Sequence, residues 1–197
     1  LEQPFEKDPD FKNEILHPSY PVDKYAGLLF VYMGPPEKRP LLPRWDVLVR
    51  KDGKRTIEIH PVLNCNWLQA MENSVDTIHT YYLHGHSMKV RDIRDGEYYY
   101  RPVKDYRWEL CEWGIIKRCT YGGEKPEEEV RPPLVFPNIL RIPQGRFECV
   151  HWRVPMDDAH TQIFVMLFDP SPDGREIEQP EDPPFAHLGS LLTPEGE

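Results

Sequence analysis

Residues 66–84 of the chain read NWLQAMENSVDTIHTYYLH, and this stretch decides the fold. Its large apolar side chains recur at intervals of three and four residues, which is the spacing of one face of an α-helix. Its amides, acids and first histidine fall on the opposite face, because successive helical residues are about 100° apart. The stretch therefore predicts an amphipathic helix over residues 64–82. Its apolar stripe is made of Trp67, Leu68, Met71, Val75 and Ile78.

Two histidines, His79 and His84, make this helix a candidate metal site. Imidazole is a common ligand of iron, zinc and copper, and a carboxylate such as Asp76 commonly orients a ligand ring. In an uninterrupted helix the two rings would point about 140° apart and could not share one ion. We therefore expect the helix to end or bulge near Tyr81–Leu83, with Gly85 as its terminator.

The charge of this region also bears on a metal site. Between Thr56 and Met88 the chain has no Lys or Arg, although average usage would place about four there. A solvated helix face normally carries some fixed cations, whereas acids, amides and histidines without them suit a bound cation. A metal site is one interpretation of the pattern. A solvated face with histidines that only cap or pack is the other.

Length and composition exclude several classes of protein. The chain has 197 residues, enough for the core of one domain, and its net charge of −9 without a basic aromatic cluster argues against nucleic-acid binding. Its longest apolar runs, Gly27–Met33 and Ile163–Phe168, are too short to cross a bilayer, and no signal peptide is evident. The cysteines at 65, 111, 119 and 149 form no CxxC pair. Reduced thiols in a cytoplasmic protein are therefore expected.

The remainder of the chain is cut by 22 prolines into short pieces that read as strands. Short connections imply antiparallel pairing, and Pro143-Gln-Gly145 is a tight hairpin signal. The expected fold class is α+β, a curved antiparallel sheet with a long helix packed on it. The expected strands are Gly27–Met33, Thr56–His60, Glu97–Arg101, Tyr106–Leu110, Trp113–Thr120, Asn138–Ile142, Arg146–Val154 and Gln162–Phe168.

Both ends of the chain read differently from its centre. Residues 1–24 are charged and contain prolines, which is typical of a surface wrap or a link to an upstream segment. Residues 170–184 mix prolines with acids and predict an extended loop. Residues 185–197 show no closing element, so the chain looks cut at both ends.

Three motifs, in the same order, resemble the catalytic domain of Rieske-type non-heme iron oxygenases, the large subunits of aromatic-ring-hydroxylating systems. The first runs from Tyr20 to Pro35 and is similar to the segment that follows the iron–sulfur domain in that family. The second is the 66–84 stretch itself. The third, residues 153–161, reads RVPMDDAHT and is similar to a strand motif of the phthalate-dioxygenase-like branch. Together the motifs span most of the chain.

The resemblance implies a helix-grip, START-like fold that carries an iron site. His79 and His84 would be two ligands of a mononuclear Fe(II). Asp76 would be the acid that connects this site to the iron–sulfur cluster of a neighbouring subunit, and Asn73 an active-site amide near the iron. The third ligand of the family is a carboxylate further along the chain, and we find no matching position before Glu197.

The resemblance also implies a domain layout and a reaction. Residues 1–24 would follow a missing domain that holds a 2Fe-2S cluster, and residues 25–197 would be a catalytic domain truncated at its C-terminus. The full-length protein, a homotrimer in this family, would hydroxylate or oxidatively demethylate an aromatic or related substrate with O₂. Electrons would come from NAD(P)H through a reductase or ferredoxin. The isolated fragment is expected to be inactive.

Two other function classes use the same residues. A helix over a curved sheet can enclose an apolar cavity and carry a hydrophobic ligand without metal, with His79 and His84 as pocket or core residues. Two histidines and an acid can also hold Zn²⁺ and activate water, as in a zinc hydrolase. The other candidates are interpreted as turn, strand or surface residues: Asp157, Asp158, His17, His60, His151 and His160.

Overall fold

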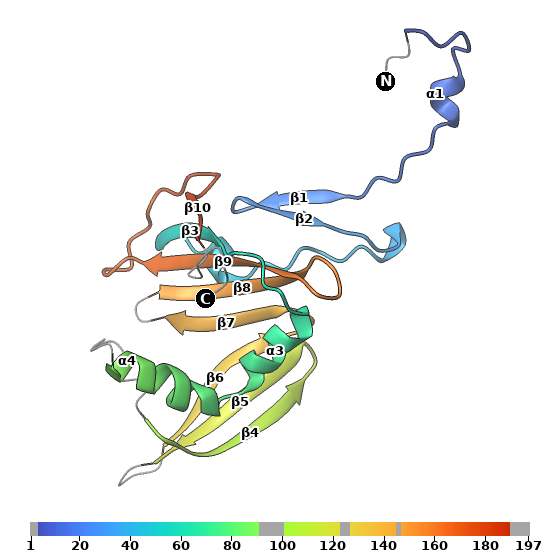
Figure 1. The fold of residues 1–197 in the computed structure, drawn as a ribbon. Helices are drawn as coiled ribbons and strands as arrows, with labels where there is room; N and C mark the ends of the chain where they lie inside the picture. The colour runs from blue at the N-terminus through green and yellow to red at the C-terminus, as the bar shows by residue number, and fades with distance from the viewer. Residues whose placement is uncertain (1–3, 91–100, 123–126, 145–146, 190–197) are drawn as a thin grey trace. The chain divides into compact units, whose positions relative to one another are not determined.

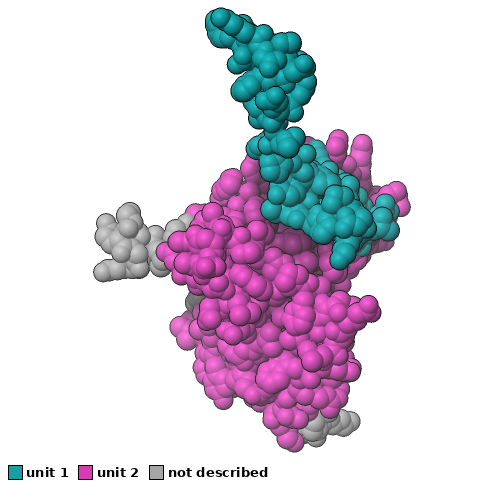
Figure 2. Space-filling model, turned by 90° about the vertical axis from the view of Figure 1, so that its right-hand side faces the viewer, with its two compact units in different colours: residues 1–44 teal, residues 45–197 magenta. Residues whose placement is uncertain are grey.

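The computed structural model of this chain describes residues 4–90, 101–122, 127–144 and 147–189. The chain divides into two compact units, residues 1–44 and residues 45–197 (Figure 2). The expected domain boundary between residues 24 and 25 stays a prediction.

The first unit contains little regular structure. Its β-hairpin turns at Ala26 and Gly27, both of which have positive φ, the backbone shape that matches the twist of a two-residue hairpin. Its elements are the helix α1 (Phe11–Glu14), the strands β1 (Val22–Tyr25) and β2 (Leu28–Val31), and a 3-10 turn η1 (Pro36–Lys38).

The second unit is built on an eight-stranded sheet with the order β10-β3-β9-β8-β7-β6-β5-β4 (Figure 1). Neighbouring strands run antiparallel except at one edge, where β10 lies parallel to β3. The strands are β3 (Gly53–Ile59), β4 (Val103–Cys111), β5 (Gly114–Tyr121), β6 (Glu127–Val135), β7 (Ile139–Gln144), β8 (Phe147–Pro155), β9 (Thr161–Pro170) and β10 (Phe185–His187).

Each face of the sheet is covered by a different helix. On one side α3 (Trp67–Val75) packs against β6 and β8, and its Met71 forms an apolar cluster with Leu134 and Leu140. On the other side α2 (Asp46–Val49) packs against β8 and β9. Because side chains alternate along a strand, the odd-numbered residues of β8 lie on the α3 face and its even-numbered residues on the α2 face. The predicted α+β class is confirmed.

The helix on the sheet is shorter than the predicted 64–82. It begins at Trp67, where the Asn66 side chain caps it by accepting from Leu68 N at 2.9 Å, and it ends at Val75. The chain is extended at Asp76, with φ −68° and ψ 124°. The reason is the Asp76 side chain, which bonds nearby backbone N–H groups and so competes with a continuous helix.

A second helical run follows the break. Its centre is a π-helical turn, η2 (Thr80–Gly85), which continues directly into α4 (His86–Val90). The bulge expected near Tyr81–Leu83 is present. Gly85 does not end the helix, because the run continues past it into α4.

The expected strands are confirmed where the structure describes them, and β7 and β8 pair across the Pro143-Gln-Gly145 signal. Glu97–Arg101 lies almost wholly outside the described residues. The strand β6 was missed because it contains acids and two adjacent prolines. The sheet accommodates Pro132 and Pro133 by a register shift: the two prolines of β6 lie opposite one residue of β5, in a bulge that takes up residues that cannot donate to the ladder.

The expectation that residues 185–197 hold no closing element was wrong. The strand β10 joins the sheet edge beside β3, with Ile57 N donating to Pro184 O and Leu188 N to Ile59 O, both at 2.9 Å. Its partner lies far away in the sequence, and three residues show no periodicity of their own. The loop before it is confirmed, since residues 171–184 contain no helix or strand. None of the helices in the described ranges is long and apolar enough to span a membrane.

Candidate functional site

Asp76 is the junction between α3 and the second helical run. Its Oδ1 accepts from Ile78 N at 2.9 Å, and its Oδ2 accepts from His79 N at 3.3 Å, which caps the new helical turn. The same carboxylate lies 3.2 Å from Nδ1 of the His79 ring. A carboxylate at Nδ1 holds the proton there and leaves Nε2 with a lone pair, the state a metal ligand needs.

The π-helical turn brings the two histidines together. The ring centroids of His79 and His84 are 5.3 Å apart, with the ring planes at 65°. A π-helix bonds residue i to residue i+5, so side chains five positions apart lie over each other, as they cannot in an α-helix. Partial shielding by surrounding atoms, and then the charge of His79, lower the pKa of His84. Both effects favour the neutral ring at physiological pH.

The other predicted site residue, Asn73, does not join this cluster through any recorded bond. It lies exposed on the last turn of α3, and its side chain makes no hydrogen bond within the part of the chain that the structure describes. The proximity of Asn73 to an iron therefore stays a prediction.

The donor set fits part of an iron site. Two close imidazoles, one of them oriented by Asp76, match the two-histidine side of a two-His-one-carboxylate centre. Among the described residues, no three or more His, Cys, Asp and Glu side chains gather in a way that could hold a metal ion. The third ligand therefore has no candidate within those ranges.

Two histidines in the sheet lie apart from this pair. His151 is on the α3 face of β8, and its ring centroid is 6.3 Å from that of His60. Burial, with the nearby charges of Arg153 and His60, lowers the pKa of His151 to about 4, so it stays neutral at physiological pH. His60 lies 3.7 Å from a Glu58 carboxylate oxygen. These contacts support the interpretation of both histidines as sheet residues.

The Asp157–His160 segment forms the turn between β8 and β9. Asp157 Oδ1 accepts from Ala159 N at 2.7 Å and lies 2.8 Å from His160 Nδ1. A side chain that bonds its own backbone two residues on is an Asx turn. The hydrogen bond from Ala159 N, followed by the one with His160, lowers the pKa of Asp157. The structure supports the interpretation of Asp157 as a turn residue.

An apolar hollow of about 380 Å³ lies between α3 and strands β5 and β6. Its lining contains no histidine, so it follows the apolar stripe of α3 and does not surround the His79–His84 pair. It is lined by Trp67, Leu68, Met71, Glu72, Val75, Ile115, Leu134, Phe136 and Pro137.

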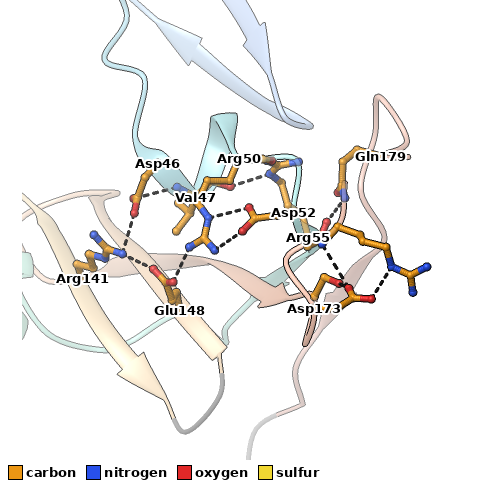
Figure 3. Close-up of polar contacts among 12 residues, drawn as sticks. Asp46, Val47, Arg50, Asp52, Arg55, Arg141, Glu148, Asp173 and Gln179 are labelled. Carbon is orange, nitrogen blue, oxygen red and sulfur yellow. Dashed lines mark hydrogen bonds and ion pairs between the residues drawn. The ribbon is translucent and has the colours of Figure 1, made fainter. Parts of the chain in front are cut away.

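A network of ion pairs lies on the α2 face (Figure 3). Arg50 binds Asp52 at 2.8 Å and Glu148 at 2.5 Å, while Arg141 binds Glu148 and, at 2.8 Å, Asp46. The hydrogen bond to Asp52 is the main reason that the pKa of Arg50 is raised. Burial opposes ionisation of Glu148, but bonds from the two arginines outweigh it and lower its pKa. The charges compensate one another, which is typical of a structural network.

Sequence reasoning missed two cations on the α3 face, Lys117 of β5 and Arg153 of β8. Each donates a hydrogen bond to a backbone carbonyl of α3. The segment from 56 to 88 lacks cations of its own, but the folded sheet supplies them from strands far away in the sequence. The only signal was that Arg153 opens the third motif.

No protein-family profile matches the chain. The phenoxybenzoate dioxygenase subunit alpha of Ectopseudomonas oleovorans is 32% identical over 83% of this chain and 44% of that protein. The 5,5'-dehydrodivanillate O-demethylase oxygenase subunit of a Sphingobium species is 33% identical, over 100% of this chain and 46% of that protein. A tert-butanol monooxygenase / tert-amyl alcohol desaturase oxygenase subunit of Aquincola tertiaricarbonis is 32% identical over 90% of this chain and 43% of that protein.

Among solved structures, the terminal oxygenase of carbazole 1,9a-dioxygenase from Nocardioides aromaticivorans has the same fold. Its TM-score is 0.59 at 20% identity, with 89% of this chain and 53% of that chain covered. This chain spans less than half the length of the curated relatives named above. It belongs to the oxygenase subunits of the Rieske-type non-heme iron oxygenases.

Proposed function

We propose that this chain is the iron-holding part of the catalytic domain of a Rieske-type oxygenase subunit. The observation that carries the proposal is the π-helical turn, which places the His79 and His84 rings 5.3 Å apart in an otherwise amphipathic helical region. In this proposal the two rings ligate ferrous iron. A carboxylate from outside the described residues is the third ligand.

The residues around the pair have separate roles in the proposal. Asp76 holds the proton on His79 Nδ1 and so presents Nε2 to the metal. Asn73, six residues before His79 in the sequence, is proposed to contribute its amide to the substrate side of the site. Asp76 is also the proposed entry point for electrons from a cluster on a neighbouring subunit. Ferrous iron in such a site supplies the reductive activation of O₂.

The activity of the full-length protein is part of the same proposal. It would hydroxylate or oxidatively demethylate an aromatic or related substrate, with electrons from NAD(P)H through a reductase or ferredoxin and a 2Fe-2S cluster. The relatives support this, since their names describe a dioxygenase, a monooxygenase and an O-demethylase. One solved structure of the same fold, with a TM-score of 0.53, is a fluorene-bound oxygenase in complex with ferredoxin.

The layout of the full-length protein is proposed from the same source. Residues 1–24 would follow the iron–sulfur domain, residues 25–197 would belong to the catalytic domain, and three copies would assemble. A cytoplasmic location agrees with the four cysteines, none of which forms a disulfide. Without the other domain the fragment should not turn over. Sustained substrate-dependent hydroxylation by this chain with an unrelated reductase would contradict that expectation.

The test is an anaerobic Fe(II) titration, followed by the electron paramagnetic resonance signal of the nitric oxide adduct. We expect saturable binding by the unaltered chain, loss in His84→Ala, and retention in the matched control His160→Ala. The control side chain is partly exposed and lies in the β8–β9 turn. Equal binding by the two variants would place the iron elsewhere, and no binding by the unaltered chain would contradict the proposed site.

Metal-free binding of a hydrophobic ligand is the second candidate, and the apolar hollow beside α3 favours it. It predicts tight binding of aromatic compounds that does not change in His84→Ala. A zinc hydrolase would use the same donors as the iron site. It predicts one firmly held Zn²⁺ per chain and hydrolysis in the absence of O₂.

A further inference from the structure

The last carbonyls of α3 are bonded by side chains from the sheet. A helix leaves its final C=O groups without partners of its own. Here Lys117 Nζ of β5 donates to Ser74 O at 2.8 Å, and Trp108 Nε1 of β4 donates to Val75 O at 3.1 Å. The register pairs Lys117 with Trp108 directly across the two strands, so both reach the same helix end. The C-terminus of α3 is therefore anchored to two strands.

Arg153 of β8 adds a second cation under the same helix. It is only 8% exposed, and its Nη1 donates to Ala70 O and to Ser74 Oγ. The other end of α3 is bound by the same motif, because Asn66 Nδ2 donates to Asp158 O at 2.9 Å. The third sequence motif, residues 153–161, thus contacts both ends of the helix that leads to the histidine pair.

Neither cation has a carboxylate partner among the described residues. Burial is the main cause that lowers the pKa of Lys117 to about 8, with the charge of Arg153 acting in the same direction, and burial lowers the pKa of Arg153 to about 10. Removing cations from water without a counter-charge is costly, and the negative end of the α3 dipole offsets only part of that cost. Apolar side chains in place of such groups often stabilise a protein. The presence of two such cations here therefore indicates that they are needed to hold α3 in position rather than to stabilise the fold.

The anchored helix end connects directly to the proposed iron site. Asp76 follows Val75 in the chain, and its backbone N–H donates to Glu72 O at 3.2 Å. Its carboxylate binds both the backbone N–H and the ring Nδ1 of His79. A displacement of the α3 C-terminus would move this carboxylate and rotate the ring that it holds.

We propose that Lys117 and Arg153 are positioning residues for the iron site. They hold the carbonyl end of α3 and thereby set the place of the Asp76 carboxylate and the orientation of the His79 ring. This inference rests on the proposed function, and it goes beyond it by assigning a role to two cations that touch neither the metal nor the substrate.

The experiment compares Lys117→Met with Arg118→Met in the anaerobic Fe(II) titration. Arg118 is the next residue of β5, lies on the opposite face and binds Glu109 at 2.7 Å, so its replacement also removes a cation from the same strand. We expect Lys117→Met to weaken Fe(II) binding about tenfold and to change the rhombicity of the nitric oxide adduct signal. Arg118→Met should alter neither. Lys117→Arg, which keeps a donor at this position, should restore the signal in part.

A second variant keeps the inference testable if Lys117→Met does not fold, as judged by circular dichroism. Trp108→Phe removes only the indole donor from an edge-strand side chain that is half exposed. We expect a smaller change of the adduct signal in the same direction. If the unaltered chain binds iron, and Lys117→Met or Trp108→Phe binds it with the same affinity and gives the same signal, the inference alone is contradicted. An unaltered chain that binds no iron contradicts the proposed function, and the inference with it.

Discussion

Two pairs of cations, one pair on each face of the sheet, are bound in opposite ways. On the α2 face, Arg50 and Arg141 are bound to carboxylates, chiefly Glu148 (Figure 3). On the α3 face, Lys117 and Arg153 are bound to the carbonyls of a helix and to no described carboxylate. Ion pairs of the first kind compensate charge and stabilise the fold locally. Cations of the second kind lose their hydration without gaining a counter-ion, and they hold in place a helix end that leads to a candidate site.

The largest expected effect is that of Arg153→Ala. This change leaves a void beside Met71 and removes the donor to Ala70 O and Ser74 Oγ, so we expect the free energy of unfolding to fall by about 3 kcal/mol. The matched change on the α2 face, Arg141→Ala, should cost about 1 kcal/mol because Arg141 is more exposed and Glu148 keeps Arg50. Urea denaturation measures both. Equal losses would remove the distinction between the two pairs of cations.

The next effect is a pH dependence of stability that belongs to Lys117. Its pKa is lowered from 10.5 to about 8 in the folded chain, so the unfolded chain binds more protons between these values. Stability from this residue should therefore rise with pH through that window, by up to about 1.4 kcal/mol per pH unit. Urea denaturation from pH 7 to 10.5 gives the free energy of unfolding of the unaltered chain and of Lys117→Met. The difference between the two, plotted against pH, is the contribution of Lys117. A difference that is constant with pH would show that Lys117 is not desolvated.

A smaller effect of the same sign is expected at acid pH on the α2 face. The pKa of Glu148 is lowered in the folded chain, so the stability it contributes is present at neutral pH and is lost as pH falls through its folded value. Glu148→Gln should lower the free energy of unfolding by about 1 kcal/mol at pH 7 and should flatten the acid limb of the stability curve. An unchanged acid limb would mean that other carboxylates dominate it.

The smallest effect concerns Trp108. Trp108→Phe removes one hydrogen bond, to Val75 O, from a half-exposed side chain, so a loss of about 0.5 kcal/mol is expected. Thermal denaturation with Trp113→Phe as the control tests it, since Trp113 is similarly exposed. A loss above 2 kcal/mol would indicate that the indole is an essential anchor of α3 rather than an accessory one.

Much of the fold was predictable from local patterns. The stripe of Trp67, Met71 and Val75 predicted an amphipathic helix, and apolar and aromatic runs predicted most of the strands. The strand β6 was not predictable by these means, because Pro132 and Pro133 are tolerated only through a bulge in β6 itself. The strand β10 was missed because its pairing partner, β3, lies more than a hundred residues away in the sequence. Asp76 was placed on a helix face, whereas its side chain ends one helix and caps the next.

The sequence by itself determined the amphipathic helix, the α+β class and the identity of the candidate ligands. It also required the helix to end or bulge if His79 and His84 are to meet, because the spacing of two residues along a helix fixes the angle between their side chains. Only the tertiary structure decided which strand closes the sheet edge and that Lys117 and Arg153 bind the end of α3. Those contacts join α3 to strand residues that lie from 43 to 83 positions away in the sequence. Their energies depend on burial and on the helix dipole, which exist only once the chain has folded.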